Sequence, residues 1–321
     1  MTAARSLARR ARAMTPAALV ACLLASLLPG CGTLSGRSTL DLDARTRNAV
    51  GAEGEVALVR TPEQQAVTVA EAAAELASAD VVFLGEQHDS AEGHAVQLAL
   101  TEALADARGE IILSMEMFER DAQRRLDLYL AGAIDEEMFL EGARPWPNYA
   151  AHYRPAVEMA RARGFEVVAA NCYRPIASRV ARRGLAEGAG DAWAARSVDV
   201  SKGEYRDRFD DVMSGGHGNS MPSAALDNIY AAQCIKDDTM AESIADAIDA
   251  RGDDAPLVVH WNGRFHSDFG LGTVERLRKR KPDLNIAVVS MIATRNVQRA
   301  LEGEELRQGH FVILVPPTSD E

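Results

Sequence analysis

Cysteine, aromatic side chains and long apolar runs are scarce in this chain of 321 residues, which has four cysteines and 5% aromatic residues. The apolar stretch near its N-terminus, residues 17–28, is shorter than the roughly 20 residues that a helix needs to cross a bilayer. It is therefore too short for a transmembrane helix. Past residue 31 only Cys172 and Cys234 remain, and the sequence leaves open whether they form a disulfide or stay as two buried thiols.

Basic residues are also in the minority, since 35 Lys and Arg face 47 Asp and Glu and give a net charge of −12. Such a chain has no electrostatic reason to bind nucleic acid. The sequence lacks C-x-x-C-H for covalent haem attachment, a C-x-x-C zinc pair and H-E-x-x-H. It also lacks G-x-S-x-G and a P-loop, which argues against a nucleophile-elbow hydrolase and a nucleoside triphosphatase.

Residues 1–30 have the features of a secretory signal peptide: four arginines, no acidic residue, and then the apolar stretch. The segment Leu28–Cys31 resembles the lipobox of bacterial lipoproteins, in which Cys31 would be diacylated and become the new N-terminus. Two acyl chains hold a protein on a membrane durably. Gly32 at the next position indicates, by resemblance to lipoprotein sorting rules, the outer membrane of the cell envelope. The alternative is an ordinary signal peptide that leaves Cys31 as a plain thiol.

Removal of residues 1–30 would change the net charge to −16. Residues 31–53 are rich in Ser, Thr, Gly, Arg and Asp and show no clear periodicity, which predicts a tether between the lipid and the fold. We expect residues 54–321 to form one α/β domain.

Short apolar, β-branched runs alternate with longer helical patterns in this region. This alternation is typical of a mostly parallel sheet covered by helices on both faces. The predicted strands are Val81–Leu84, Ile111–Met115, Glu166–Ala169, Leu257–His260, Ile286–Met291 and Phe311–Val315.

Two helical regions are well marked. Asp89 and Glu92 are spaced as a capping box at the start of a helix whose apolar stripe is Val96, Ala99, Leu100, Ala103 and Leu104. Residues 121–250 contain much helix and one strand, which predicts a helical insertion or lid, with a long helix over 223–250 and a mobile loop near Gly216.

Polar residues follow several predicted strands. In a parallel sheet ligands bind beyond the carboxyl ends of the strands, where we expect Glu86, His88, Glu116 and His266 to gather. Histidines and carboxylates in such a group could bind a divalent metal or act as general acid and base. The third interpretation is a purely structural network of buried hydrogen bonds.

Tyrosine is a second source of ligands, because a phenolate suits ferric haem. Tyr153 lies between His152 and Arg154, which could bond to it or to a haem propionate, although it could equally pack against the sheet. Tyr205 and His217 lie in a less regular stretch and are further candidates.

Several motifs follow one another along the chain: Val81–His88, Ser114–Glu119, Trp146–Tyr149, His152–Pro155, Gln233, Asp237, Met240–Ala241 and Gly263–His266. Taken in series they resemble the ChaN family of haem-binding lipoproteins, part of a superfamily with erythromycin esterases and Tiki metalloproteases. The resemblance implies an α/β fold of the esterase and ChaN type, a role in haem or iron acquisition, and a homodimer with paired haems. It also implies that Glu86, His88, Glu116 and His266 match an ancestral catalytic or metal site.

Two functions follow as hypotheses. The first is a non-enzymatic haem-binding lipoprotein that holds haem, with Tyr153, Tyr205 and His217 as candidate ligands, and passes it to an uptake receptor. The second is a metal-dependent peptidase or esterase, in which Glu86 or Glu116 is the general base. In that case His88, His266 and Glu116 would hold Mn²⁺, Co²⁺ or Zn²⁺ with a bound water.

Overall fold

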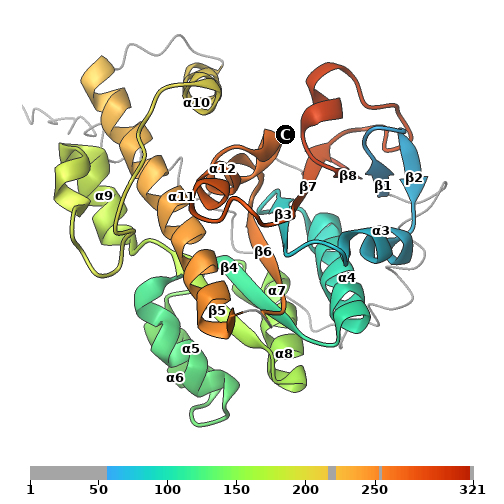
Figure 1. Ribbon diagram of the computed structural model, residues 1–321, viewed down its shortest axis with the longest axis horizontal. Coiled ribbons are helices and arrows are strands. Elements are labelled where there is room, and N and C mark those ends of the chain that lie inside the picture. The colour runs from blue at the N-terminus through green and yellow to red at the C-terminus, as the bar shows by residue number, and fades with distance from the viewer. Residues whose placement is uncertain (1–55, 216–221, 253–254, 319–321) are drawn as a thin grey trace, which may run out of the picture. The chain divides into compact units, whose positions relative to one another are not determined.

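The computed structural model describes residues 56–215, 222–252 and 255–318, and its centre is one eight-stranded sheet (Figure 1). The strands are β1 Ala57–Arg60, β2 Gln65–Val67, β3 Val81–Glu86, β4 Ile111–Glu119, β5 Glu166–Asn171, β6 Leu257–Gly263, β7 Ile286–Ala293 and β8 Phe311–Val315. Their order across the sheet is β2-β1-β8-β7-β3-β6-β4-β5. The strands from β3 to β8 pair in parallel, and only β1 pairs antiparallel, with both β2 and β8.

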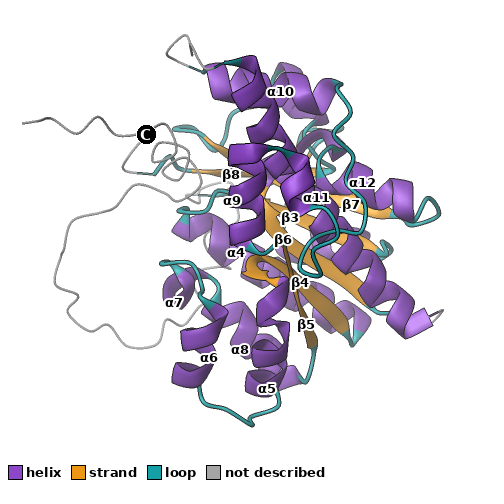
Figure 2. Cartoon of the chain, turned by 90° about the vertical axis from the view of Figure 1, so that its left-hand side faces the viewer, coloured by secondary structure: helices purple, strands orange, loops and turns teal. Residues whose placement is uncertain are grey.

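Helices cover both faces of this sheet, and Figure 2 shows the strands between them. The helices are α3 Val69–Leu76, α4 Ala91–Arg108, α5 Gln123–Leu130, α6 Glu136–Ala143, α7 Tyr149–His152, α8 Arg154–Arg163, α9 Arg174–Arg183, α10 Glu204–Ser214, α11 Ser223–Arg251 and α12 Thr273–Arg280. The expected α/β class, with a mostly parallel sheet and helices on both faces, is confirmed.

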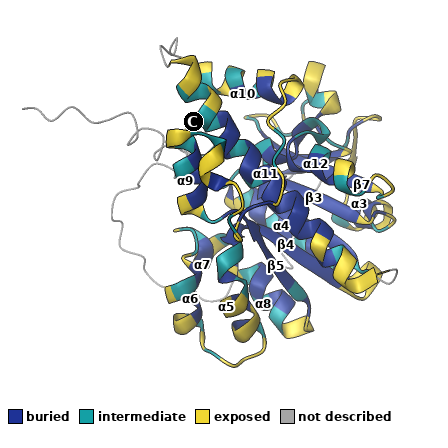
Figure 3. Cartoon of the chain, turned by 60° about the vertical axis from the view of Figure 1, so that its left-hand side comes forward, coloured by how far each residue is buried: buried dark blue, intermediate teal, exposed yellow. Residues whose placement is uncertain are grey.

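Alternate residues of each strand point to opposite faces, and this divides the core into two parts. On β3, Val82 and Leu84 belong to the larger core, to which α3, α4 and the helices from α5 to α8 also contribute. Val81 and Phe83, on the other face, belong to a second core to which α11 and α12 contribute. All four are at most 1% exposed. Because β3 is buried on both faces, its sequence is a continuous apolar run. Figure 3 shows the buried strands at the centre and the exposed surfaces on the outer sides of the helices.

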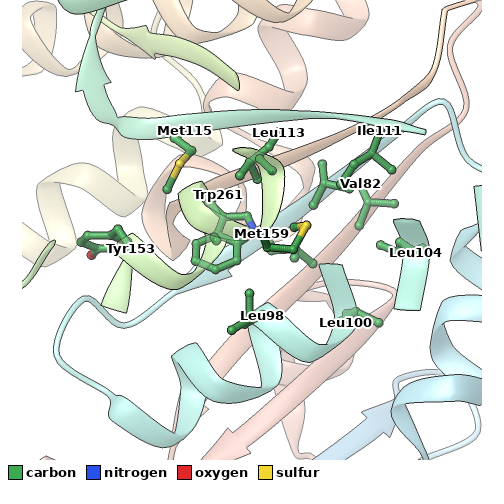
Figure 4. Packing of buried hydrophobic residues seen from close by; sticks show 14 of the residues in the cluster. Val82, Leu98, Leu100, Leu104, Ile111, Leu113, Met115, Tyr153, Met159 and Trp261 are labelled. Carbon is green, nitrogen blue, oxygen red and sulfur yellow. The ribbon is translucent and has the colours of Figure 1, made fainter. Parts of the chain in front are cut away.

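Trp261 of β6 is the largest fully buried side chain among the described residues. It packs in the larger core with Leu113 and Met115 of β4 and with Leu98 of α4 (Figure 4). Its indole Nε1 donates a hydrogen bond to Thr101 Oγ1 at 3.0 Å, so the one polar atom of the ring is satisfied.

The start of α4 corrects one prediction. The N-cap is Ser90, whose hydroxyl accepts from the Gly93 amide at 3.1 Å, and not Asp89. The expected capping box between Asp89 and Glu92 is therefore wrong by one residue. The predicted stripe is correct in its large members, since Val96, Leu100 and Leu104 are buried.

The predicted helix over 223–250 is α11, and β5 lies between helices within residues 121–250. The loop near Gly216 falls outside the described residues. No helix in the described part of the chain is long and apolar enough to cross a membrane. Cys172 and Cys234 are free, buried thiols, and burial raises the pKa of Cys172 to about 11 and that of Cys234 to about 12.

Candidate functional site at the carboxyl edge of the sheet

The predicted strand-end residues gather at the carboxyl ends of β3, β4 and β6. Glu86 ends β3 and is paired in register with Gly263, which ends β6. The Gly263 amide donates a hydrogen bond of 2.7 Å to Glu116 Oε2 on β4. Since these strands are neighbours in the sheet, Glu86 and Glu116 are held on a rigid frame.

Glu86 is the centre of a first group of contacts. Its Oε1 accepts from Tyr153 at 2.7 Å and lies 2.9 Å from His88 Nδ1, and its Oε2 lies 3.6 Å from His94 Nδ1. Burial raises the pKa of this carboxyl, but the nearby His94 and His88 outweigh that effect and leave the pKa below its usual range. Glu86 is therefore an anion at neutral pH.

Both ring nitrogens of His94, on α4, have polar partners. Its Nδ1 lies 3.0 Å from Gln97 Oε1, and its Nε2 lies 3.2 Å from the carbonyl oxygen of His88. The ring of His152 stacks on it at 4.3 Å. Burial and the nearby His94 lower the pKa of His152 to about 4, so His152 is neutral at neutral pH.

His266 forms a second group with two carboxylates. Its Nδ1 lies 2.7 Å from Asp237 Oδ1, and its Nε2 lies 3.4 Å from Glu116 Oε1. Burial lowers the pKa of His266, but Glu116 and Asp237 outweigh burial and raise the pKa to about 10. His266 is therefore an imidazolium between two anions.

Asp237, on α11, has three further polar neighbours besides His266. Tyr205 donates to its Oδ2 at 2.5 Å, and Thr273 donates to its Oδ1 at 2.9 Å. Burial raises the pKa of Asp237, yet the charges of His266 and Arg276 and these hydrogen bonds leave it lowered. The carboxylate is thus satisfied within the protein.

His88 is the most open member of the strand-end cluster, with 37% of its side chain exposed. A Cβ on Gly263 would lie 2.7 Å from both Cε1 and Nε2 of His88, so only glycine leaves room for the imidazole there. The Trp146 ring contacts His88 edge to face, with 4.7 Å between centroids. The imidazole is therefore held on two sides.

The predicted metal site is not supported. His88, His266 and Glu116 lie at the same edge, but within residues 56–215, 222–252 and 255–318 no group of three or more His, Cys, Asp or Glu side chains could hold a metal ion. Glu116 is occupied by His266 and the Gly263 amide. His266 has a carboxylate on each ring nitrogen and so offers no lone pair to a metal.

The candidate haem ligands have different positions. Tyr153 and Tyr205 are buried, and each donates its hydroxyl hydrogen bond to a carboxylate, Glu86 and Asp237 respectively. Burial and these carboxylates raise the pKa of both phenols well above the usual range, so neither is a phenolate at neutral pH as folded here. His217 and the lipidation candidate Cys31 lie outside the described residues.

Sequence reasoning overlooked two polar residues of this edge, His94 and Lys236. His94 could have been noticed because it shares one face of α4 with Gln97, three residues on, and that face turns toward the strand end. Lys236 precedes Asp237 on α11 and is half-buried. Burial lowers its pKa, and Glu116 is among the charges that oppose this.

A surface hollow of about 610 Å³ begins next to this cluster, at the residue after His88. Its lining includes neither Glu86 nor Glu116. The residues around it are Asp89, Ala91, Glu92, Thr294, Arg295, Val297 and Pro316–Thr318.

Comparison with solved structures places this fold among known proteins. ChaN of Campylobacter jejuni, described as binding haem cofacially, matches with a TM-score of 0.61 and 18% identity, over 80% of this chain and 96% of that chain. The type III effector HopBA1 matches with a TM-score of 0.44 and 14% identity, over 77% and 93% of the two chains. An erythromycin esterase mutant in its open conformation matches with a TM-score of 0.42 and 14% identity, over 74% and 76%.

No curated protein matches the sequence. The family model of the haem-binding uptake proteins of the Tiki superfamily, ChaN, matches residues 72–277, which include every strand of the site and both groups of contacts. The expected resemblance is thereby confirmed, and the chain belongs to the ChaN family of haem-binding uptake proteins.

Proposed function

We propose that this protein is a lipid-anchored haem carrier of the bacterial cell envelope, which binds haem at the carboxyl edge of its sheet as a homodimer and serves haem uptake. Membership of the haem-binding uptake family supports haem as the ligand. The likeness in fold to a ChaN that binds haem cofacially supports the homodimer. The secretory signal and the lipobox before Cys31 support the anchor.

The side chains at this edge fit haem, which supplies an iron that takes nitrogen or oxygen ligands and two propionates. His88 has a half-exposed imidazole, and no described residue bonds to its Nε2. Trp146 offers an aromatic surface beside it. Lys236 is half-buried and has no ion pair with the described residues, so its ammonium group is available to a propionate.

The observation that carries the proposal is this open imidazole beside an aromatic ring in a chain of the haem-binding family. The hydrolase hypothesis has less support, because it needs a metal ion and no group of three or more His, Cys, Asp or Glu side chains among the described residues could hold one. Of its expected metal ligands, His266 has a carboxylate at each ring nitrogen, and its pKa of about 10 keeps it protonated.

A hemin titration of the full chain, purified from bacterial membranes in detergent, tests the proposal. We expect saturation near one haem per chain by visible absorption and a dimer in the haem-loaded form by light scattering. Binding that does not saturate would refute the haem-carrier role.

The anchor is tested separately. We expect mass spectrometry to find a diacylglyceryl group on Cys31, and we expect Cys31→Ser to appear in the aqueous fraction while haem binding is unchanged. A wild-type chain that starts at another residue, with an unmodified Cys31, would contradict the lipoprotein assignment and leave haem binding intact.

A further inference from the structure

Helix α9 presents a basic face on an acidic chain. The helix has four arginines and no acidic residue, whereas the whole chain has a net charge of −12. Its apolar residues Ile176, Ala177 and Val180 are buried in one cluster with residues of α11, which lies alongside (Figure 1). The arginines lie outside this cluster and are exposed or partly exposed: Arg174, Arg179, Arg182 and Arg183.

Two of these arginines are not neutralised by neighbours. Arg182 is exposed and has no ion pair with a described residue. Arg183 is 69% exposed, and its ion pair with Glu187 is long, at 3.9 Å. A surface pair of this kind contributes little free energy. Both guanidinium groups are therefore available to an anionic surface.

Trp193 adds an exposed aromatic ring beside the start of α9. Its carbonyl oxygen accepts from the amide of Tyr173, the N-cap of α9, at 3.2 Å. It is the only aromatic side chain exposed to solvent among the described residues, at 44%. Tryptophan is enriched where membranes meet water, because its ring is apolar and its N–H is polar. Arginines next to such a ring are typical of a surface that binds anionic lipids.

The described chain begins at the same edge of the sheet. β1 is antiparallel to β8, so Ala57 at its start pairs with Leu314 near the carboxyl end of β8. The segment that connects Cys31 to the fold therefore enters at the carboxyl edge. α9 follows the carboxyl end of β5, and the amide of Arg174 donates to Glu119 at the end of β4. β1 and β5 are six strand spacings apart, about 30 Å.

We propose that the arginines of α9 and Trp193 form a docking surface for anionic phospholipid headgroups of the membrane in which the lipid anchor sits. This inference rests on the anchor proposed for Cys31. The acidic remainder of the chain is repelled by such headgroups, so α9 selects one orientation. Together the tether beside β1 and α9 beside β5 turn the carboxyl edge toward the bilayer. Haem bound at this edge then lies next to the headgroups.

Sedimentation with vesicles tests the docking surface without the anchor. We expect the Cys31→Ser full chain to bind vesicles of phosphatidylcholine mixed with phosphatidylglycerol, less so as salt is added, and not to bind phosphatidylcholine alone. Arg182→Gln combined with Arg183→Gln should weaken binding roughly 25-fold, since each arginine contributes roughly fivefold. Arg108→Gln combined with Arg163→Gln is the matched control. These two residues end α4 and α8, where β4 and β5 begin, so the same charge is lost from the opposite edge.

The lipidated wild-type chain gives a second readout, because the anchor holds it on both kinds of vesicle. Hydroxyl-radical labelling, measured by mass spectrometry, should modify Trp193 several-fold less on the mixed vesicles than on phosphatidylcholine alone. Leu128 is the internal control. It is 38% exposed on α5, near the start of β5, and should be labelled equally on both.

The outcomes separate this inference from the proposed function. Equal binding to both kinds of vesicle, equal losses in the two double variants, or unchanged labelling of Trp193 would each overturn the docking surface. The last two results are those expected if α9 instead binds an acidic protein. An unmodified Cys31 in the wild type, with sedimentation as expected, would refute the anchor and leave the docking surface standing.

Discussion

At the scale of single residues, the charge of His266 is set by its two carboxylate neighbours. Its folded pKa, about 10, lies above the value of roughly 6.5 in an unfolded chain. A raised pKa contributes stability that is fully present below the unfolded value and is lost as pH rises through the folded value. We therefore expect the His266 ring protons to titrate near pH 10 by NMR, and titration near 6.5 would contradict the contacts described.

Replacement of His266 removes the cation that lies between the buried carboxylates of Asp237 and Glu116. We expect His266→Ala to lower the free energy of unfolding by about 3–5 kcal/mol in urea denaturation. Tyr205→Phe is the matched control, since it removes one hydrogen bond to Asp237 and keeps the ion pair, and should cost about 2 kcal/mol. Equal losses in the two variants would show that the ion pair adds nothing.

Lys236 is the residue expected to meet a propionate. We expect Lys236→Met to weaken hemin binding by about tenfold, a free energy of about 1.4 kcal/mol, with an unchanged iron spectrum. Lys202→Met is the control, because Lys202 is 70% exposed and lies 3.6 Å from Asp227. If the affinity stays at the wild-type value in Lys236→Met, the propionates bind elsewhere.

The site could be predicted from the sequence as far as its position in a parallel sheet allows. Glu86 and Glu116 lie in or at the ends of strands, and His88 and His266 follow strands, so topology alone brings them together. The partners of these residues could not be predicted. That Tyr153 bonds Glu86, 67 residues earlier in the sequence, depends on how α8 packs against the sheet, which no local pattern encodes.

At the scale of elements, a stability measurement can show whether Ser90 or its neighbour Asp89 caps the N-terminus of α4. Ser90 caps the helix, whereas no described hydrogen bond involves the Asp89 side chain. We expect Ser90→Ala to lower the free energy of unfolding by about 1 kcal/mol and Asp89→Ala by about 0.5 kcal/mol or less, both by urea denaturation. A larger loss in Asp89→Ala than in Ser90→Ala would instead support the capping box of Asp89 and Glu92 expected from the sequence.

The six long strands were predictable because burial on both faces requires apolar residues at every position. β1 and β2 were not predicted, because they have four and three residues, and Gln65 and Ala66 of β2 are exposed at the edge of the sheet. A short strand that pairs antiparallel at an edge carries little periodicity. β1 depends on pairing with β8, which is more than 240 residues away, and β2 in turn pairs with β1.

At the scale of the whole molecule, the buried carboxylates set the lower limit of the stable pH range. The pKa values of Glu86, Glu116 and Asp237 are lowered in the fold. A lowered pKa contributes stability that is present above the unfolded value, about 4, and is lost as pH falls through the folded value. We expect the midpoint urea concentration to decrease as the pH is lowered below about 4. We also expect it to decrease from roughly pH 6.5 to pH 10, where His266 stays protonated in the fold but is neutral in the unfolded chain.

A pH series of urea unfolding curves checks this expectation, with Glu116→Gln as the comparison. In that variant the acid limb should be shallower, because one carboxylate no longer has to be protonated. A midpoint that stays constant from pH 7 to pH 3 would show that these carboxylates are not ionised in the fold.

The three tryptophans of the chain differ in how far they are exposed to solvent. Trp261 is fully buried under the carboxyl edge, Trp146 touches His88, and Trp193 is 44% exposed. Their emission should therefore divide into a blue-shifted and a red-shifted part. A porphyrin absorbs at the wavelengths where indole emits, so bound haem should quench the fluorescence of nearby tryptophans. Quenching of the blue-shifted part would report occupancy of the edge without any label.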